Sequence, residues 1–139
     1  MMMKSLIVRI SQVSFASLLI LALGCNAGPR QLQTIQLPSG DRVGVLSEMT
    51  MHFSNESPAL MLKYQTQLHV SDRAATRREA DELWTIFKPE VEKGNFDSAI
   101  LSANEVPTGT FIQNSNTYNF VYRKQGDGTW LNLDDKKTP

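Results

Sequence analysis

The chain has 139 residues, with 14 basic and 14 acidic side chains and therefore no formal net charge at neutral pH. This length suits one domain with a modest core. The balanced charge, without a stripe of Lys and Arg, excludes the electrostatic footprint of a nucleic-acid-binding protein. The lone cysteine, Cys25, excludes an internal disulfide, so packing must hold the domain together.

The first 24 residues have the layout of a secretory signal peptide. Lys4 and Arg9 carry the only charges, and an uncharged, largely apolar stretch follows up to Gly24. A basic start, a short apolar core and a small residue before the cleavage point are typical of such a signal. The apolar core is shorter than the roughly 20 residues of a membrane-spanning helix. We therefore expect residues 1–24 to be a leader cleaved after Gly24.

The end of this leader carries a second motif. Leu-Ala-Leu-Gly-Cys at residues 21–25 resembles the lipobox of bacterial lipoproteins, and the resemblance covers residues 1–25 only. It implies that diacylglycerol is attached to the Cys25 thiol, that cleavage follows Gly24 and that the new amino terminus is acylated. Two or more acyl chains make a durable membrane anchor. Ordinary signal cleavage, which would release the protein with a free Cys25, is the alternative.

The residues after Cys25 bear on location. By the same resemblance, Asn26 is not the Asp that retains lipoproteins in the inner membrane, which implies the periplasmic side of the outer membrane if the host is Gram-negative. Residues 25–33 are then the lipidated cysteine and a tether. An extended tether of this length keeps the domain within roughly 25 Å of the bilayer.

Three strands are predicted before the first helix. Residues 32–37 and 42–53 are apolar in patches, and the Pro-Ser-Gly-Asp sequence at residues 38–41 predicts a turn between them. In the second segment four side chains share one parity: Val45, Met49, Met51 and Phe53. Residues 60–70 alternate apolar and polar side chains, which is typical of a strand with one face on a core and one in water.

A helix is predicted over residues 73–93, with Asp72 in the N-cap and Gly94-Asn95 closing it. An apolar stripe recurs at helical spacing: Ala80, Leu83, Trp84, Phe87 and Val91. Pro89 removes the amide that would bond back to Thr85, which predicts a kink or a break.

Three strands are predicted after the helix: residues 97–104, 110–122 and 129–133. Gly126-Asp127-Gly128 predicts a hairpin before the last of them. Residues 34–133 are thus expected to form a single α+β domain. Its mostly antiparallel sheet of five to seven strands carries the helix on one face, and residues 134–139 form a polar tail.

The search for chemistry in the sequence finds no catalytic motif. His52 and His69 have no metal-ligand spacing, so exposed strand histidines are the favoured interpretation, and neither a metal nor a cofactor is expected. A recognition surface rich in Tyr and Asn is the one candidate site besides Gly24 and Cys25. It comprises four residues: His69, Tyr118, Asn119 and Tyr122.

These observations favour a small, non-enzymatic lipoprotein of the cell envelope that binds another envelope protein through an exposed sheet face or edge. A periplasmic inhibitor or an immunity-like protein is a narrower version by analogy of fold alone. The alternative is a small-ligand carrier or minor enzyme. It would need a pocket between helix and sheet, lined by aromatic side chains such as Tyr64, Trp84, Phe120 or Trp130.

Overall fold

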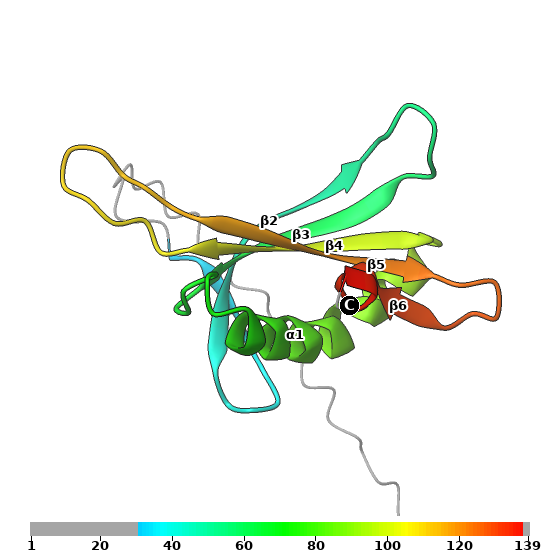
Figure 1. Cartoon of the computed structure of the whole chain (residues 1–139), viewed down its shortest axis with the longest axis horizontal. Coiled ribbons are helices and arrows are strands. Elements are labelled where there is room, and N and C mark those ends of the chain that lie inside the picture. Colours follow the sequence, from blue (N-terminus) through cyan, green and yellow to red (C-terminus); the bar gives the residue numbers. More distant parts are fainter. Residues whose placement is uncertain (1–30, 138–139) are drawn as a thin grey trace, which may run out of the picture. The chain divides into compact units, whose positions relative to one another are not determined.

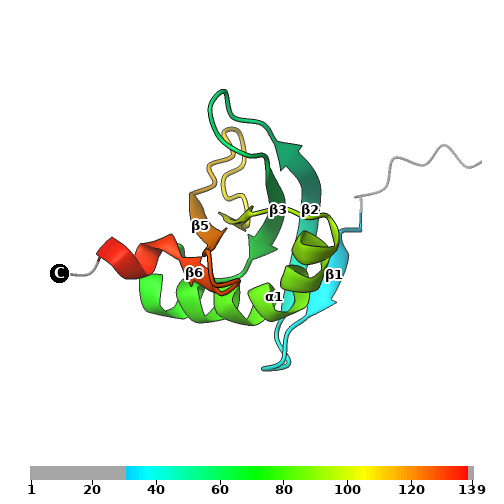
Figure 2. The same ribbon diagram turned by 90° about the vertical axis from the view of Figure 1, so that its right-hand side faces the viewer.

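The computed structural model describes residues 31–137, so Gly24 and Cys25 of the predicted leader and lipobox lie outside the described residues (Figures 1 and 2). The described part contains six strands, one α-helix and one short 3₁₀-helix. Their bounds are β1 Gln33–Gln36, β2 Arg42–Met51, β3 Ala59–Thr66, α1 Arg73–Lys93, β4 Ser98–Glu105, β5 Thr117–Lys124, β6 Trp130–Asn132 and the 3₁₀-helix η1 Leu133–Lys137.

The strands form one sheet in the order β1-β2-β3-β4-β5-β6. Neighbouring strands are antiparallel except β3 and β4, which are parallel. Parallel neighbours need a long crossover, and the 21-residue helix α1 supplies it by returning the chain along one face of the sheet (Figure 2). The predicted α+β class, with one helix on a mostly antiparallel sheet, is confirmed.

Both ends of α1 are capped by local hydrogen bonds. The Asp72 carboxylate accepts from the Ala75 amide at 3.1 Å. At the other end Asn95 takes a left-handed φ of 56°, and the Phe96 amide donates to the Val91 carbonyl at 3.1 Å. This pattern is a Schellman motif, and it satisfies carbonyls that the end of a helix leaves free.

The helix continues through Pro89, so of the predicted kink or break the break is wrong, and the kink stays a prediction. Phe87 and Val91, on either side of the proline, are both buried against the sheet. Pro89 itself is exposed, so its ring costs no core packing. Tertiary packing of the flanking residues outweighs the lost hydrogen bond.

The core lies between α1 and the sheet. Its centre is formed by fully buried side chains from the helix and from the middle strands: Tyr64, Ala80, Leu83, Ala99, Leu101 and Ala103. Aromatic side chains close the end near β6, where Trp84 stacks on Tyr122 with ring centroids 4.2 Å apart and Trp130 meets Trp84 edge-on. The small residues on β4 let the helix approach the sheet closely.

A bulge in β2 reverses the direction of its side chains. Val45 pairs with Tyr64, but the next paired residue, Ser47, faces Lys63, so Leu46 is the extra residue. Val45 therefore lies on the helix side of the sheet. After the bulge the odd-numbered residues of β2, Met49 among them, lie on the opposite side. The prediction that Val45 and Met49 share one face is wrong because of this single insertion.

Several segment ends differ from the predictions. The strand expected over residues 60–70 ends at Thr66, and the strand expected from Thr110 begins only at Thr117. The predicted polar tail begins with η1, whose Asp134 carboxylate accepts from the Tyr118 hydroxyl at 2.9 Å. The carboxylate of Asp135 pairs with Arg77 at 2.9 Å, so η1 packs beside α1.

Candidate protein-binding face

The face of the sheet that points away from α1, called here the outer face, has an apolar centre. Four side chains on β2, β3, β4 and β5 lie opposite one another in the register and form what we call the apolar row: Met49, Met61, Ile100 and Val121. Directly paired residues of neighbouring strands share a face. Within residues 31–137, no helix covers this side of the sheet (Figures 1 and 2).

Strand alternation explains why these side chains point outward. Their sequence neighbours Leu62, Leu101 and Phe120 belong to the core beneath α1, so the residues before or after them must face the other way. Met49 is 37% exposed, whereas Met61, in the middle of the row, is only 7% exposed. The row is therefore a shallow apolar surface whose centre is already well packed.

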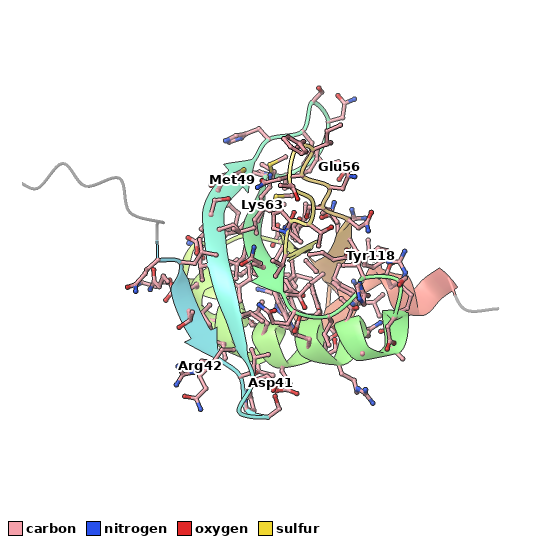
Figure 3. The ribbon with its side chains drawn as sticks, turned by 90° about the vertical axis from the view of Figure 1, so that its left-hand side faces the viewer. Asp41, Arg42, Met49, Glu56, Lys63 and Tyr118 are labelled. Carbon is pink, nitrogen blue, oxygen red and sulfur yellow. The ribbon has the colours of Figure 1, made fainter. Side chains whose placement is uncertain are left out.

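Polar side chains border the apolar row on one flank. The adjacent row is formed by Ser47, Lys63, Ser102 and Asn119. Beyond it Asn104 donates to the Ser102 carbonyl at 2.8 Å and accepts from the Thr117 hydroxyl at 2.8 Å, which fixes the polar end of the face. Figure 3 labels Met49 and Lys63 on the part of the sheet away from α1. An apolar centre with a hydrogen-bonded polar border is typical of protein interfaces.

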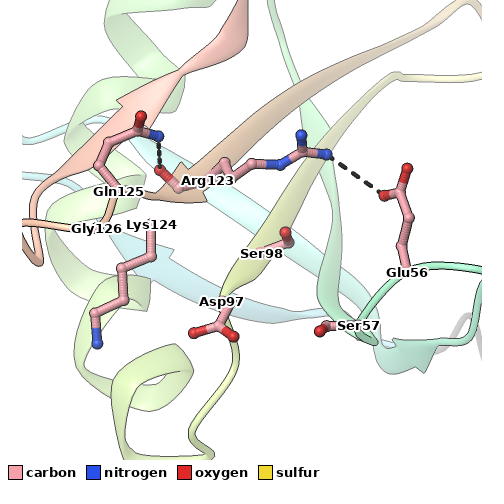
Figure 4. Close-up of a pocket in the computed structure, with 8 residues that line it drawn as sticks. All are labelled: Glu56, Ser57, Asp97, Ser98, Arg123, Lys124, Gln125 and Gly126. Atoms are coloured by element: carbon pink, nitrogen blue, oxygen red, sulfur yellow. Dashed lines mark hydrogen bonds and ion pairs between the residues drawn. The ribbon is translucent and has the colours of Figure 1, made fainter.

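A polar groove of about 570 Å³ borders the other flank of the apolar row (Figure 4). Arg123 of β5 reaches across it to the Glu56 carboxylate at 3.4 Å. Lys124 and Asp97 supply one further charge of each sign, and Ser57 and Ser98 also line the groove. With two acidic and two basic side chains the groove has no net charge, so it fits polar and backbone groups better than an ion.

Two loops rise beside the outer face. Residues 52–58 join β2 to β3, and residues 106–116 join β4 to β5. In Figure 2 both loops lie on the side of the sheet opposite α1. Phe53, on the first loop, is 44% exposed, and Val106, at the base of the second, is 39% exposed. Each loop therefore carries an exposed apolar side chain.

The structure separates the four residues of the predicted recognition surface. Only Asn119 lies on the outer face. Tyr118 lies on the helix side, where the Arg73 guanidinium sits 3.5 Å from its ring centroid. Tyr122 is buried beneath Trp84, and its hydroxyl donates to Asp81 at 3.2 Å.

His69 follows the end of β3 and is solvent-exposed, with Nδ1 3.7 Å from Glu105 Oε1. The Glu105 carboxylate also accepts from the Val70 amide at 2.8 Å. This amide hydrogen bond, helped by Asn116 and by the charge of His69, holds the pKa of Glu105 below its ordinary value. These contacts therefore tie the segment after β3 to the end of β4.

Two buried polar groups lie under α1. Glu79 is 9% exposed and its Oε1 has no hydrogen-bond partner, as is also true of the Tyr64 hydroxyl. Burial raises the pKa of Glu79, the charges of Asp41 and Glu82 raise it further, and hydrogen bonding with Thr66 opposes them. Burial likewise raises the pKa of Tyr64. Tyr64 is fully buried in the core, whereas Glu79 also lines a pocket of about 270 Å³ with Asp41 and Glu82.

The aromatic side chains that a ligand pocket would require contact one another instead. Tyr64 is fully buried and Phe120 is 2% exposed, and Phe120 packs edge-on against Tyr118. Trp84 is covered by Tyr122 and Trp130. Phe120 and Tyr118 nevertheless line a pocket of about 370 Å³ with Arg73 and Arg77 of α1, so the carrier and enzyme alternatives stay predictions.

The described residues show neither a metal cluster nor a membrane-spanning helix. In the part of the chain that the structure describes, no group of three or more His, Cys, Asp or Glu side chains could hold a metal ion. Among residues 31–137 no helix is long and apolar enough to cross a membrane. No family model, curated protein or solved structure matches the chain.

Sequence reasoning missed the outer face because of the bulge at Leu46. A count of alternate positions through β2 assigns Val45 and Met49 to one face, which conceals the pairing of Met49 with Met61. The available signal was in β3 and β4, where Met61 and Ile100 interrupt positions that an exposed strand face would fill with polar residues.

Proposed function

We propose that the protein is a lipid-anchored accessory protein of the bacterial cell envelope that binds another envelope protein through its outer face. The observation that carries this proposal is the apolar row, four apolar side chains aligned across the uncovered side of a sheet. The lipobox at residues 21–25 supports the location. A partner must then lie at or near the same membrane surface.

The composition of the row suits a protein partner. Met49 and Met61 have flexible, polarizable side chains, and methionines adapt to irregular partner surfaces. Lys63 and Arg123 border the row and can contact acidic or carbonyl groups at the rim. Exposed apolar surface with polar edges is the pattern expected of an interaction site.

The size of the face indicates what else must take part. Four strands about 4.8 Å apart and four rows about 6.6 Å apart span roughly 14 by 20 Å. This area is smaller than the ~800 Å² per partner of a standard interface. The loop of residues 52–58 must contribute to a stable complex, and the strands alone would support only a transient one.

The test is recovery of a partner from detergent-extracted envelopes by the full chain. Met49→Glu places a charge on the apolar row and should lower recovery at least tenfold. Thr50→Glu is the matched control, because Thr50 is the exposed next residue of β2 and faces the opposite side. Both variants should unfold within about 0.5 kcal/mol of the wild type, as surface substitutions do.

Equal recovery by Met49→Glu and the wild type would contradict binding through the outer face. The anchor has a separate test in the intact mass of the membrane-extracted chain, which should correspond to a chain that begins at an acylated Cys25. Cys25→Ser should either leave the leader uncleaved or release the protein from the membrane. A membrane-retained chain of mature mass without acyl groups would overturn the anchor and leave the outer-face proposal unchanged.

A further inference from the structure

The loop between β4 and β5 is built as a rigid hairpin. Thr108 and Asn114 form an isolated antiparallel bridge, with amide-to-carbonyl hydrogen bonds of 3.0 and 2.9 Å in the two directions. At its base the Ser115 hydroxyl donates to the Glu105 carbonyl at 2.8 Å, and the Asn116 side chain donates to the Glu105 carboxylate at 3.1 Å. The hairpin of residues 106–116 therefore holds its tip in a defined position.

Glycine makes the tight turn at the tip possible. Gly109 has φ of +113°, and a Cβ at this position would collide with the Ile112 carbonyl oxygen. A left-handed backbone that other residues rarely adopt is thus used where the chain must fold back on itself.

The side chains that this turn presents are the most exposed large apolar groups in the described part of the chain. Phe111 is 99% exposed and Ile112 is 75% exposed. No charged residue occurs between Glu105 and Arg123. The hairpin is thus an uncharged projection that ends in two exposed apolar side chains. Transfer of each of these side chains from water into an apolar environment lowers the free energy.

We propose that the hairpin of residues 106–116 inserts Phe111 and Ile112 into the apolar region of the lipid bilayer. The inference rests on the proposed lipid anchor, because a neutral two-residue tip is too weak to localise a protein unaided. With the anchor present, the tip adds a second contact with the bilayer and so fixes the orientation of the domain. The absence of charge favours lipid interior over an anionic headgroup surface.

The place where the chain enters the sheet agrees with this arrangement. Gln33, at the start of β1, lies in the same row of the register as Ala103, two residues before β4 ends at Glu105 and leads into the hairpin. Figure 1 shows the first described residues beside β1 and the β4–β5 hairpin at the same end of the sheet. The first residue of β1 and the base of the hairpin therefore lie near the same end of the sheet.

The segment from Cys25 to Gln31 and the segment from Glu105 to Phe111 are equally long. Gln31 is six positions after Cys25, and Phe111 is six positions after Glu105. Each spans at most roughly 20 Å when extended. The tip can thus lie at the depth of the acylated cysteine. In this orientation the sheet stands with one end on the bilayer, and the outer face stays open to a neighbour in the same membrane.

The experiment measures depth in vesicles of phosphatidylcholine that contain the lipidated full chain. Ile112→Cys is labelled with an environment-sensitive fluorophore, and lipids carrying a quencher in the acyl chain are added. Gly126→Cys is the matched control, since Gly126 lies in the β5–β6 hairpin with open space around its Cβ position. The label at 112 should be quenched at least twofold more than the label at 126.

Two further measurements make the proposal falsifiable. Phe111→Ser in the chain labelled at 112 should abolish the excess quenching, whereas added salt or anionic phosphatidylglycerol should leave it unchanged, because the hairpin carries no charge. Equal quenching at 112 and 126 in a chain shown by mass to be lipidated would overturn the hairpin proposal alone. Shielding of the label at 112 in native envelopes without lipid quenching would show a protein contact and also overturn it.

Discussion

The two faces of the sheet share the same strands and differ in almost every other respect. On the helix side, Leu101 and Tyr64 are fully buried beneath α1, and the flanking aromatic rings stack on one another. On the outer face, the adjacent residue Ile100 is half-buried and Met49 is 37% exposed, with no helix over them in residues 31–137. The neighbouring residues Leu101 and Ile100 of β4 thus lie in the packed core and on the open apolar surface, respectively.

This difference assigns separate roles to the two faces. Apolar burial is the main source of folding stability, and most of it lies on the helix side. Apolar side chains left open on the outer face contribute less to folding and are available for a partner. Substitutions on the helix side should therefore change stability most, whereas substitutions on the outer face should change binding most.

The largest expected effect comes from neighbouring residues of β4. Leu101→Ala empties a fully buried site and should lower the free energy of unfolding by about 3–5 kcal/mol. Ile100→Ala removes a half-buried side chain from the outer face and should cost only about 1 kcal/mol. Urea denaturation of both variants makes the comparison, and equal losses would show that the outer face is part of the folding core.

A smaller effect concerns the buried carboxyl group of Glu79. Burial raises its folded pKa above the ordinary value of 4.5, so the folded state holds the proton more tightly than the unfolded state. The contribution of the protonated Glu79 to the free energy of unfolding is therefore fully present below about pH 4.5, and it is lost as the pH rises through the folded pKa. Glu79→Gln removes this loss, and the variant should exceed the wild type in stability at pH 7.

The advantage of Glu79→Gln should shrink as the pH is lowered to 4, where the wild-type carboxyl is protonated in both states. Denaturation in urea at pH 4 and pH 7 measures the difference. Groups such as Glu105, whose pKa is lowered, titrate in both proteins and cancel in the comparison. A stability difference that is the same at both pH values would contradict the burial of a charged Glu79.

The helix side of the molecule is largely predictable from sequence. The bounds of α1 agree with the predicted residues 73–93, because Asp72 and Gly94-Asn95 are strong local cap signals. The apolar alternation that begins at Leu60 identified β3, although the strand ends at Thr66. These features depend on local sequence and on a regular period, which a single chain displays directly.

The outer face and the hairpin tip are much less predictable. The bulge at Leu46 is a one-residue irregularity that shifts every later side chain of β2, and strand pairing reveals it only in the folded sheet. Phe111 and Ile112 look like strand residues by composition, yet they stand at an exposed turn set by Gly109. Both features arise from long-range pairing, which local patterns do not encode.

The most direct test of the central claim, that the outer face binds an envelope protein, is site-specific photo-crosslinking in intact envelopes. A photoreactive residue at position 49 lies on the apolar row, and one at position 50 lies on the same strand with the opposite orientation. The account predicts one defined protein adduct at position 49 and none at position 50. Equal adducts at both positions, or none at position 49, would contradict it.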